Sequence, residues 1–164
     1  MYPRKIKNYT AFLDGTSYMG RTVEGKLPEL KLKISEYRGG GMDGSVDVSM
    51  GQEKMEAEVN FAEWNPEVFK AWGNRKALVL RPGAQGENDF SADSFIFTMR
   101  GRFLNLSPDA LKPTDDSNLK LMMNVDYFKV ERNSEELIEI DVENMIRIVD
   151  GVDQLAEMRA AMGV

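Results

Sequence analysis

Residues 54–61, Lys54–Phe61 with the sequence KMEAEVNF, indicate the fold more clearly than any other stretch of the chain. Apolar side chains occupy every second position from Met55 to Phe61, and polar side chains occupy the positions between them. Alternate side chains of a β-strand project from opposite faces, so this pattern predicts a strand with one dry face and one wet face. Glu56 and Glu58 lie on the wet face, which is therefore predicted to be acidic.

The same alternation recurs further along the chain, in residues 119–127, with the sequence LKLMMNVDY. Five apolar side chains are predicted to share one face there: Leu119, Leu121, Met123, Val125 and Tyr127. Further strands are predicted at about 5–13, 17–24, 28–37, 45–50, 76–81, 93–104 and 135–141, and loops at 82–92 and 107–118. The predicted class is mainly β, a β-sandwich or partly closed barrel with an extended hairpin loop and one or two short helices.

A short helix is predicted at residues 66–72, because Asn65 is a favourable N-cap, Pro66 suits the first helical position and Gly73 suits the stop. A C-terminal helix is predicted at residues 153–162.

In the C-terminal helix, Asp153 is the expected cap and Gly163 the expected terminator. Leu155, Met158 and Met162 form an apolar stripe that we expect to pack into the core. No linker or internal repeat divides the chain, so residues 1–164 are expected to form a single domain.

Two residue types are missing from the composition: the chain contains neither cysteine nor histidine. A disulfide framework, a thiol nucleophile and histidine-dependent catalysis or metal binding are therefore excluded. The chain also lacks the long apolar stretch of a membrane helix and the apolar segment of a secretory signal. We expect a soluble protein made in a cytoplasm, with no membrane anchor.

Charge is unevenly distributed along the chain. The net charge of −6 argues against nonspecific binding of nucleic acid through a basic face. Residues 1–38 carry eight basic and four acidic side chains, whereas residues 131–157 carry two basic and nine acidic ones. This polarity fits two solvated surfaces of a monomer, and it also fits head-to-tail association of copies.

Residues 39–44, with the sequence GGGMDG, match the G-x-G-x-x-G pattern of dinucleotide-binding turns, and an acidic residue, Glu63, follows at about the expected distance. Such a turn must lead into a helix that holds the pyrophosphate, but the alternating segment after Gly44 predicts a strand instead. A Walker loop is excluded because Ser45, not lysine, follows Gly44. We expect either a mobile hairpin tip or an arm that reaches another subunit, with Met42 as an adaptable apolar anchor.

The acidic residues do not form a convincing catalytic set. Glu56 and Glu58 share a face, but no electrophilic group or sugar-binding aromatic platform accompanies them locally. Asp115 and Asp116 fall in a predicted loop, where aspartates commonly form turns. We therefore expect no catalytic, cofactor-binding or metal-binding residues.

Several motifs, in order and spacing, resemble the major tail tube protein family of contractile-tailed bacteriophages and R-type bacteriocins. They are LPEL at 27–30, YRGGGMDG at 37–44, MGQEKMEAEVNF at 50–61, MRGR at 99–102 and EIDVENMIRIVDGVDQLAEMRAAMG at 139–163. The segments at about 62–98 and 103–120 contribute little to the resemblance.

The resemblance implies a non-enzymatic subunit that forms hexameric rings with a continuous inner β-barrel, stacked as a tube inside a contractile sheath. Implied partners are other copies of the chain and the sheath, tape measure, baseplate and tail terminator proteins. The implied location is the virion, after assembly in the bacterial host cytoplasm, with DNA passing through the lumen without specific binding. The glycine-rich loop, at about 38–50, would join subunits or rings through Arg38, Gly39, Gly40, Gly41, Met42, Asp43 and Gly44.

The resemblance also assigns surfaces to other residues. Glu56 and Glu58 would face the lumen, where a negative wall repels DNA phosphates. Glu67 and Lys70 are expected on a sheath-facing surface of the short helix. Three alternatives stay open: the tube of a headless R-type bacteriocin, a monomeric β-sandwich that binds a sugar or peptide, and a nucleotide-dependent enzyme that uses the glycine-rich loop.

Overall fold

The computed structural model describes residues 1–164 and confirms the mainly β class, with 55% of residues in strands and 8% in two short helices. The elements in chain order are β1 (Lys5–Leu13), β2 (Thr16–Ser17), β3 (Thr22–Lys26), β4 (Leu32–Tyr37), β5 (Val46–Gln52), β6 (Met55–Phe61), α1 (Pro66–Ala71), β7 (Arg75–Gln85), β8 (Ala92–Pro108), β9 (Leu119–Arg132), β10 (Glu135–Asp141), β11 (Ile146–Val149), β12 (Val152–Asp153) and α2 (Ala156–Met162).

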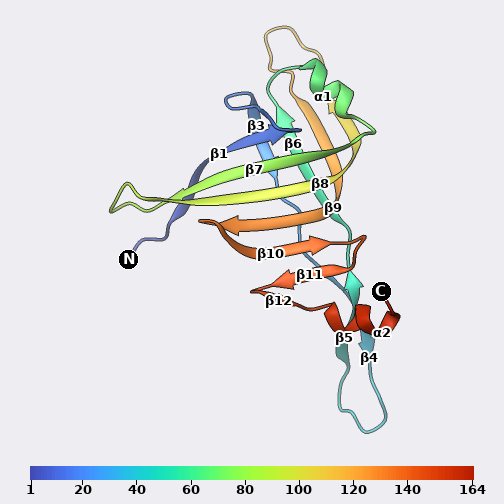
Figure 1. Cartoon of the computed structure of the whole chain (residues 1–164). Helices are drawn as coiled ribbons and strands as arrows, with labels where there is room; N and C mark the ends of the chain where they lie inside the picture. The colour runs from blue at the N-terminus through green and yellow to red at the C-terminus, as the bar shows by residue number, and fades with distance from the viewer.

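Ten strands form one branched antiparallel sheet. Its main path runs β12-β11-β10-β9-β8-β7-β1-β2, and β6 leaves this path by pairing with the first half of β9 and, on its other side, with β3. Figure 1 shows β6 crossing behind the strands of the main path, so the sheet folds over on itself. The sheet does not close into a barrel, and β3 and β12 remain edge strands.

The core lies between the two layers of this sheet. The apolar side chains of β6, from Met55 to Phe61, are at most 1% exposed, which confirms the dry face predicted for this strand. Leu119, Leu121 and Met123 of β9 are equally buried. Burial of each Val, Leu, Met or Phe side chain among them contributes roughly 1.5–3 kcal/mol of hydrophobic free energy.

The predicted alternation of β9 is wrong at Tyr127, because a β-bulge shifts the pattern by one residue. Tyr127 lies opposite Arg100, but the next residue of β8, Gly101, lies opposite Val125, so Asp126 is the extra residue. After the bulge Phe128 points into the core, while Tyr127 is half-buried on the other face. There its hydroxyl donates a 3.0 Å hydrogen bond to Glu139.

Several strand ends differ from the predictions. β7 continues to Gln85 through Pro82 and Gly83, within the stretch that we predicted as a loop. β8 extends to Pro108, and the short strands β11 and β12 were not predicted at all.

α1 covers Pro66–Ala71 against a predicted range of 66–72. The Asn65 side chain accepts a 2.9 Å hydrogen bond from the Glu67 amide, and Gly73 follows the helix with a φ of 80°. The N-cap at Asn65 and the stop at Gly73 are thus confirmed. The helix buries Val68 and Ala71 against the sheet.

α2 differs more from its prediction. It begins at Ala156, because Val152 and Asp153 pair with β11, and Leu155 is the N-cap instead of Asp153. No residue of α2 is buried, and Met158 and Met162 are more than half exposed, so the expected packing of the stripe into the core is wrong. Gly163 terminates the helix with a φ of 77°.

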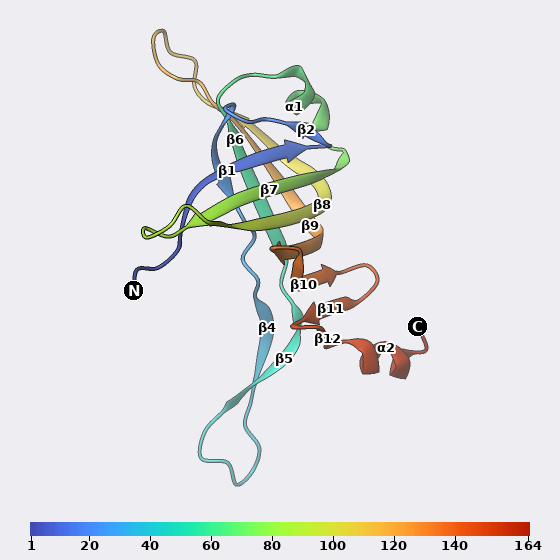
Figure 2. The ribbon, with the colours of Figure 1, turned by 60° about the vertical axis from the view of Figure 1, so that its left-hand side comes forward.

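β4 and β5 form a separate two-stranded sheet, which we call the ribbon. Figure 2 shows the ribbon projecting away from the rest of the molecule, in line with β3 and β6. Apart from Gln52, every residue of its two strands is exposed. The ribbon is the extended hairpin loop that the sequence predicts.

Candidate assembly interface

The tip of the ribbon holds the glycine-rich residues Arg38–Gly44. Its fold is local: the Met42 amide donates to the Gly39 carbonyl over 3.2 Å, and the Gly39 amide lies 3.1 Å from the Met42 sulfur. Gly41 has a φ of 85°, so it is the glycine whose backbone a side chain would strain, whereas a Cβ on Gly40 would meet nothing within 4 Å. No residue outside the ribbon hydrogen-bonds to the tip, which is available for contact with another molecule.

One face of the ribbon carries an apolar stripe. Val46, Val48 and Met50 alternate along β5, and Tyr37 lies opposite Val46 on β4. All four side chains are exposed, by 43–61%. An isolated two-stranded sheet is marginally stable in water, and exposed apolar patches commonly mark interaction sites. The stripe therefore has the exposure and apolar character of an interaction site.

The opposite face of the ribbon carries two acidic residues side by side. Glu36 lies directly across from Asp47, and neither carboxylate forms an ion pair within the chain. Like charges at directly opposite positions repel each other. Cations from another molecule would relieve this repulsion.

The wet face of β6 is less acidic than the strand alone suggests. Glu56 is paired with Lys54 over 3.2 Å, and Glu58 lies opposite Lys26 of β3. Lys120 of β9 lies opposite Asn60 on the same face. Glu56 and Glu58 are thus brought together on one surface, as predicted, but their neighbours make that surface one of mixed charge.

α1 lies at the end of the molecule opposite the ribbon (Figure 1). Its exposed side carries Glu67 and Lys70, which form a 3.3 Å ion pair with each other. Trp64 and Trp72 flank them, and the indole nitrogens donate to the Ser117 and Leu104 carbonyls over 2.9 and 2.8 Å.

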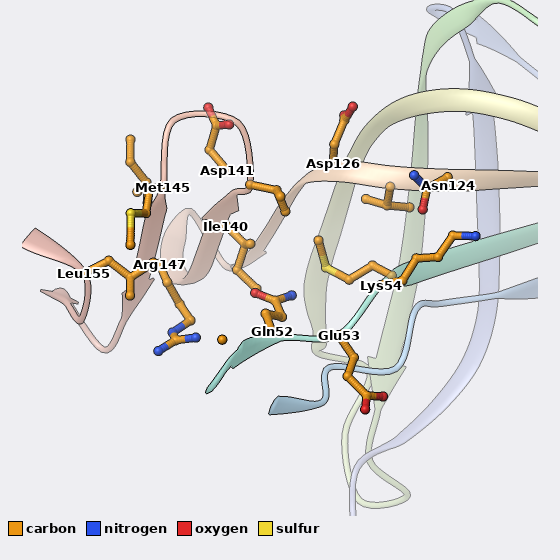
Figure 3. Close-up of a pocket in the computed structure, with 15 residues that line it drawn as sticks. Gln52, Glu53, Lys54, Asn124, Asp126, Ile140, Asp141, Met145, Arg147 and Leu155 are labelled. Atoms are coloured by element: carbon orange, nitrogen blue, oxygen red, sulfur yellow. The ribbon is translucent and has the colours of Figure 1, made fainter. Parts of the chain in front are cut away.

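A cleft of about 420 Å³ separates the base of the ribbon from the C-terminal strands. Figure 3 shows Ile140 and Leu155 on the side formed by the C-terminal strands and Gln52 on the side of the ribbon. The Gln52 amide nitrogen and the Asn124 amide oxygen are buried without hydrogen-bond partners. The sequence gives no signal for this cleft, because its walls come from segments far apart in the chain.

A charged pair holds the C-terminal wall of the cleft in place. Arg159 donates to Asp153 over 2.6 Å and to the Met145 carbonyl over 2.7 Å. The hydrogen bond from Arg159 is the main cause that lowers the pKa of Asp153, and a second hydrogen bond from the Leu155 amide adds to it. The ion pair between Arg159 and Asp153 therefore has a structural role: it fixes the start of α2 to the segment that follows β10.

The acidic side chains are dispersed over the molecule. No group of three or more Asp or Glu side chains is arranged to hold a metal ion. The strongest pKa shift belongs to Lys129, whose pKa is raised above its ordinary value by hydrogen bonds to Glu136 and Glu131. Neither helix has the length and apolar character needed to cross a membrane.

The family model described as phage tail tube protein FII matches residues 3–163. The chain belongs to this family. The tail tube protein of Escherichia phage P2 is 31% identical over 172 aligned positions, covering 99% of this chain and 98% of that protein. The major tail tube protein of Serratia phage KSP20 is 29% identical, over 91% of this chain and 89% of that protein. The resemblance inferred from the motifs is thus confirmed.

Solved structures share the fold of this tail tube protein at low sequence identity. A chain of the sheath/tube terminator of the PVC extracellular contractile injection system matches 80% of this chain and 98% of its own length, with a TM-score of 0.63 and 10% identity. A chain of the sheath-tube complex of that system matches 79% of this chain and 92% of its own length, with a TM-score of 0.60 and 9% identity. A chain of the tube-terminating cap of the anti-feeding prophage matches 80% of this chain and 92% of its own length, with a TM-score of 0.62 and 9% identity.

Proposed function

We propose that six copies of this tail tube protein close into a ring and that the rings stack into the inner tube of a contractile tail. The observation that carries this proposal is the layer β3-β6-β9-β8, which is open at both ends. β3 has no partner on its outer side. β8 loses β7 after Arg102, and beyond Leu104 only β9 pairs with it.

Unpaired strand edges are a site of association, and closing a sheet into a barrel removes them. In the proposed ring, β3 of one copy pairs with the end of β8 in the next copy. Each copy then contributes four strands to a continuous inner barrel. The Trp72 indole already donates a hydrogen bond to the Leu104 carbonyl. Residues 105–108 are therefore the part of β8 that would pair with β3 of the next copy.

The wet face of β6 would line the lumen, with Glu56 and Glu58 exposed to passing phage DNA. Their carboxylates would repel DNA phosphates, and the lysines of the same face, Lys26, Lys54 and Lys120, would limit the net charge of the wall. Such a wall conducts DNA without binding it. The tube acts as a conduit and not as an enzyme, in keeping with a family of structural proteins.

The remaining surfaces suit other partners of the tail. Residues Arg38–Gly44 at the ribbon tip would contact a neighbouring subunit or the next ring. Glu67 and Lys70 on α1 would face the sheath, and the ends of the tube would meet baseplate and terminator proteins, with a tape measure protein inside. Assembly would take place in the host cytoplasm, and the finished tube would be part of the virion.

Reversing the charge of the lumen wall tests this assignment. In a phage that carries the double variant Glu56→Lys/Glu58→Lys, tubes should assemble but DNA release should slow by roughly tenfold or more, because lysines in the channel bind phosphates. Asp116→Lys, an exposed loop position, serves as the control for the charge change itself. Unchanged release in the double variant would show that β6 does not line the channel. A headless particle with the same tube would instead point to a bacteriocin.

A further inference from the structure

A tryptophan is exposed at one end of the layer β3-β6-β9-β8, beside the end of β8. Trp72 directly follows α1, and this helix buries Val68 and Ala71 in the core, so it lies on the core side of the layer. The Trp72 indole donates to the Leu104 carbonyl over 2.8 Å, which fixes the ring beside β8. Trp72 nevertheless remains 57% exposed. A large aromatic side chain is thus held in place without being covered.

Trp72 stands where the free edge of β8 begins. The Gly73 amide donates to the Phe103 carbonyl over 2.8 Å, and the Phe103 amide donates to the Asn74 carbonyl over 3.1 Å. Residues 73 and 74 therefore cover the edge of β8 as far as Phe103. Residues 105–108, which pair only with β9, follow immediately. A strand that pairs with residues 105–108 must therefore lie next to Trp72.

A groove opens at the other end of the same layer, beside the free edge of β3. Its volume is about 260 Å³, and six of its eight lining residues are hydrophobic. Gly25 of β3 lies opposite the buried Val59, so it faces the core side of the layer. A Cβ on Gly25 would meet Leu80 and Tyr9 at 3.3 and 3.4 Å. The rest of the lining consists of Ile6, Leu27, Pro82, Phe95 and Phe97.

The groove is an unfilled end of the core. Tyr9, Leu27 and Phe97 pack against buried core residues on one side and line the groove on the other. Ile6 is 56% exposed. The Tyr9 hydroxyl is buried and has no hydrogen-bond partner within the chain, whereas buried polar groups are normally paired. The groove therefore has the apolar character and the incomplete packing of an interaction site.

Trp72 does not reach the groove of its own copy. The groove adjoins β3 and Trp72 adjoins the end of β8, and both β6 and β9 lie between these two edges. Three strand spacings of about 4.8 Å separate the edges by about 14 Å across the layer. The two features can meet only between copies.

We propose that Trp72 of one copy fills the groove of the neighbouring copy whose β3 pairs with residues 105–108. The inference rests on the proposed ring and names the side-chain contact that accompanies the strand pairing. Joining the two edges places Trp72 and the groove next to each other, on the core side of the joined layer. Tryptophans that enter apolar pockets are common energetic centres of protein interfaces.

Tryptophan fluorescence in assembled rings tests the contact. The chain has two tryptophans and no cysteine, so Trp64→Phe leaves Trp72 as the only tryptophan and Ile6→Cys carries a nitroxide label at the groove. The label should leave Trp72 emission unchanged in the dilute, unassembled chain. In rings verified by electron microscopy, the label of the neighbouring copy should quench that emission by roughly half or more. A label at Val152→Cys, 64% exposed on β12, should not quench it.

A second variant tests the groove without a label. Ile6→Glu should leave the thermal unfolding of the unassembled chain unchanged, because the side chain is more than half exposed. It should raise the protein concentration needed for ring formation by roughly tenfold or more, because a charge in the groove opposes entry of the indole. Val152→Glu, the control for the charge, should assemble at the ordinary concentration.

Two results would overturn the inference: rings in which the label at position 6 quenches Trp72 no more than the label at position 152, or an unchanged assembly threshold for Ile6→Glu. Failure of the unsubstituted chain to form any ring would instead contradict the proposed function.

Discussion

At the scale of single residues, Gly101 allows β8 and β9 to approach each other closely. It lies in the MRGR motif of β8, next to the bulge of β9, where the backbones of the two strands approach closely. A Cβ on Gly101 would lie 1.8 Å from the Asn124 carbonyl oxygen, which is backbone and cannot move aside like a flexible side chain. Glycine is therefore required here by contact with the neighbouring strand.

Replacing Gly101 with alanine should destabilise the unassembled chain by roughly 3 kcal/mol, because the strands must separate to admit the methyl group. The free energy of unfolding in denaturant measures the effect. Gly83→Ala is the matched control, since Gly83 also lies in a paired strand but a Cβ there meets nothing within 4 Å. Equal stability of the two variants would show that the approach of β8 to β9 is looser than described.

The ribbon tip offers a second comparison of glycines. Gly41→Ala places a side chain at a φ of 85° and should cost about 1 kcal/mol in the tip conformation, whereas Gly40→Ala should cost little. If the tip contacts another copy, Gly41→Ala raises the protein concentration needed for assembly by roughly fivefold. Light scattering against concentration measures this threshold. Equal thresholds for both variants would mean that the tip conformation does not matter for assembly.

Some residue-level features can be predicted from the sequence and others cannot. The cap at Asn65 depends only on the residues beside it, so local preferences predict it. The position of Tyr127 depends on a bulge between two strands, which alternation within one strand cannot reveal. The sequence likewise shows three glycines in a row without indicating that Gly41 is the one with a positive φ.

At the scale of elements, prediction succeeds where one face of a strand is buried, as in β6. The β5 strand of the ribbon also alternates, so the pattern predicts it correctly as a strand. Its apolar face is nevertheless exposed in the single chain, and alternation alone would suggest that it is buried. α2 shows the same limit, because its stripe of Met158 and Met162 points away from the core. β11 and β12 are too short for any alternation to be visible.

The pairing of Asp153 with Arg159 makes the C-terminal elements sensitive to acid. The pKa of Asp153 is lowered from an ordinary value of 3.8, so the pairing contributes stability above about pH 3.8 and loses it as the pH falls through the lower folded value. Asp153→Asn should therefore lower the thermal unfolding midpoint at pH 7, and the difference from the unsubstituted chain should shrink as the pH falls below 3.8. Asp150→Asn, at an exposed turn, is the control. A difference that is constant with pH would contradict this role.

At the scale of the whole molecule, the chain is an incomplete unit. The ribbon stripe and the open edges of β3 and β8 leave apolar or hydrogen-bonding groups uncovered. The sequence can indicate each strand that carries them, but edges and grooves arise from the order of strands, which alternation does not encode. In the proposed ring, neighbouring copies of the chain close the edges of β3 and β8.

Cryo-electron microscopy of tubes assembled from the concentrated, purified chain tests this account most directly. We predict sixfold rings in which β3 of one copy is hydrogen-bonded to residues 105–108 of the next, with Glu56 and Glu58 on the channel wall. A chain that stays monomeric at every concentration, or a ring in which both of these edges face solvent, would contradict the account.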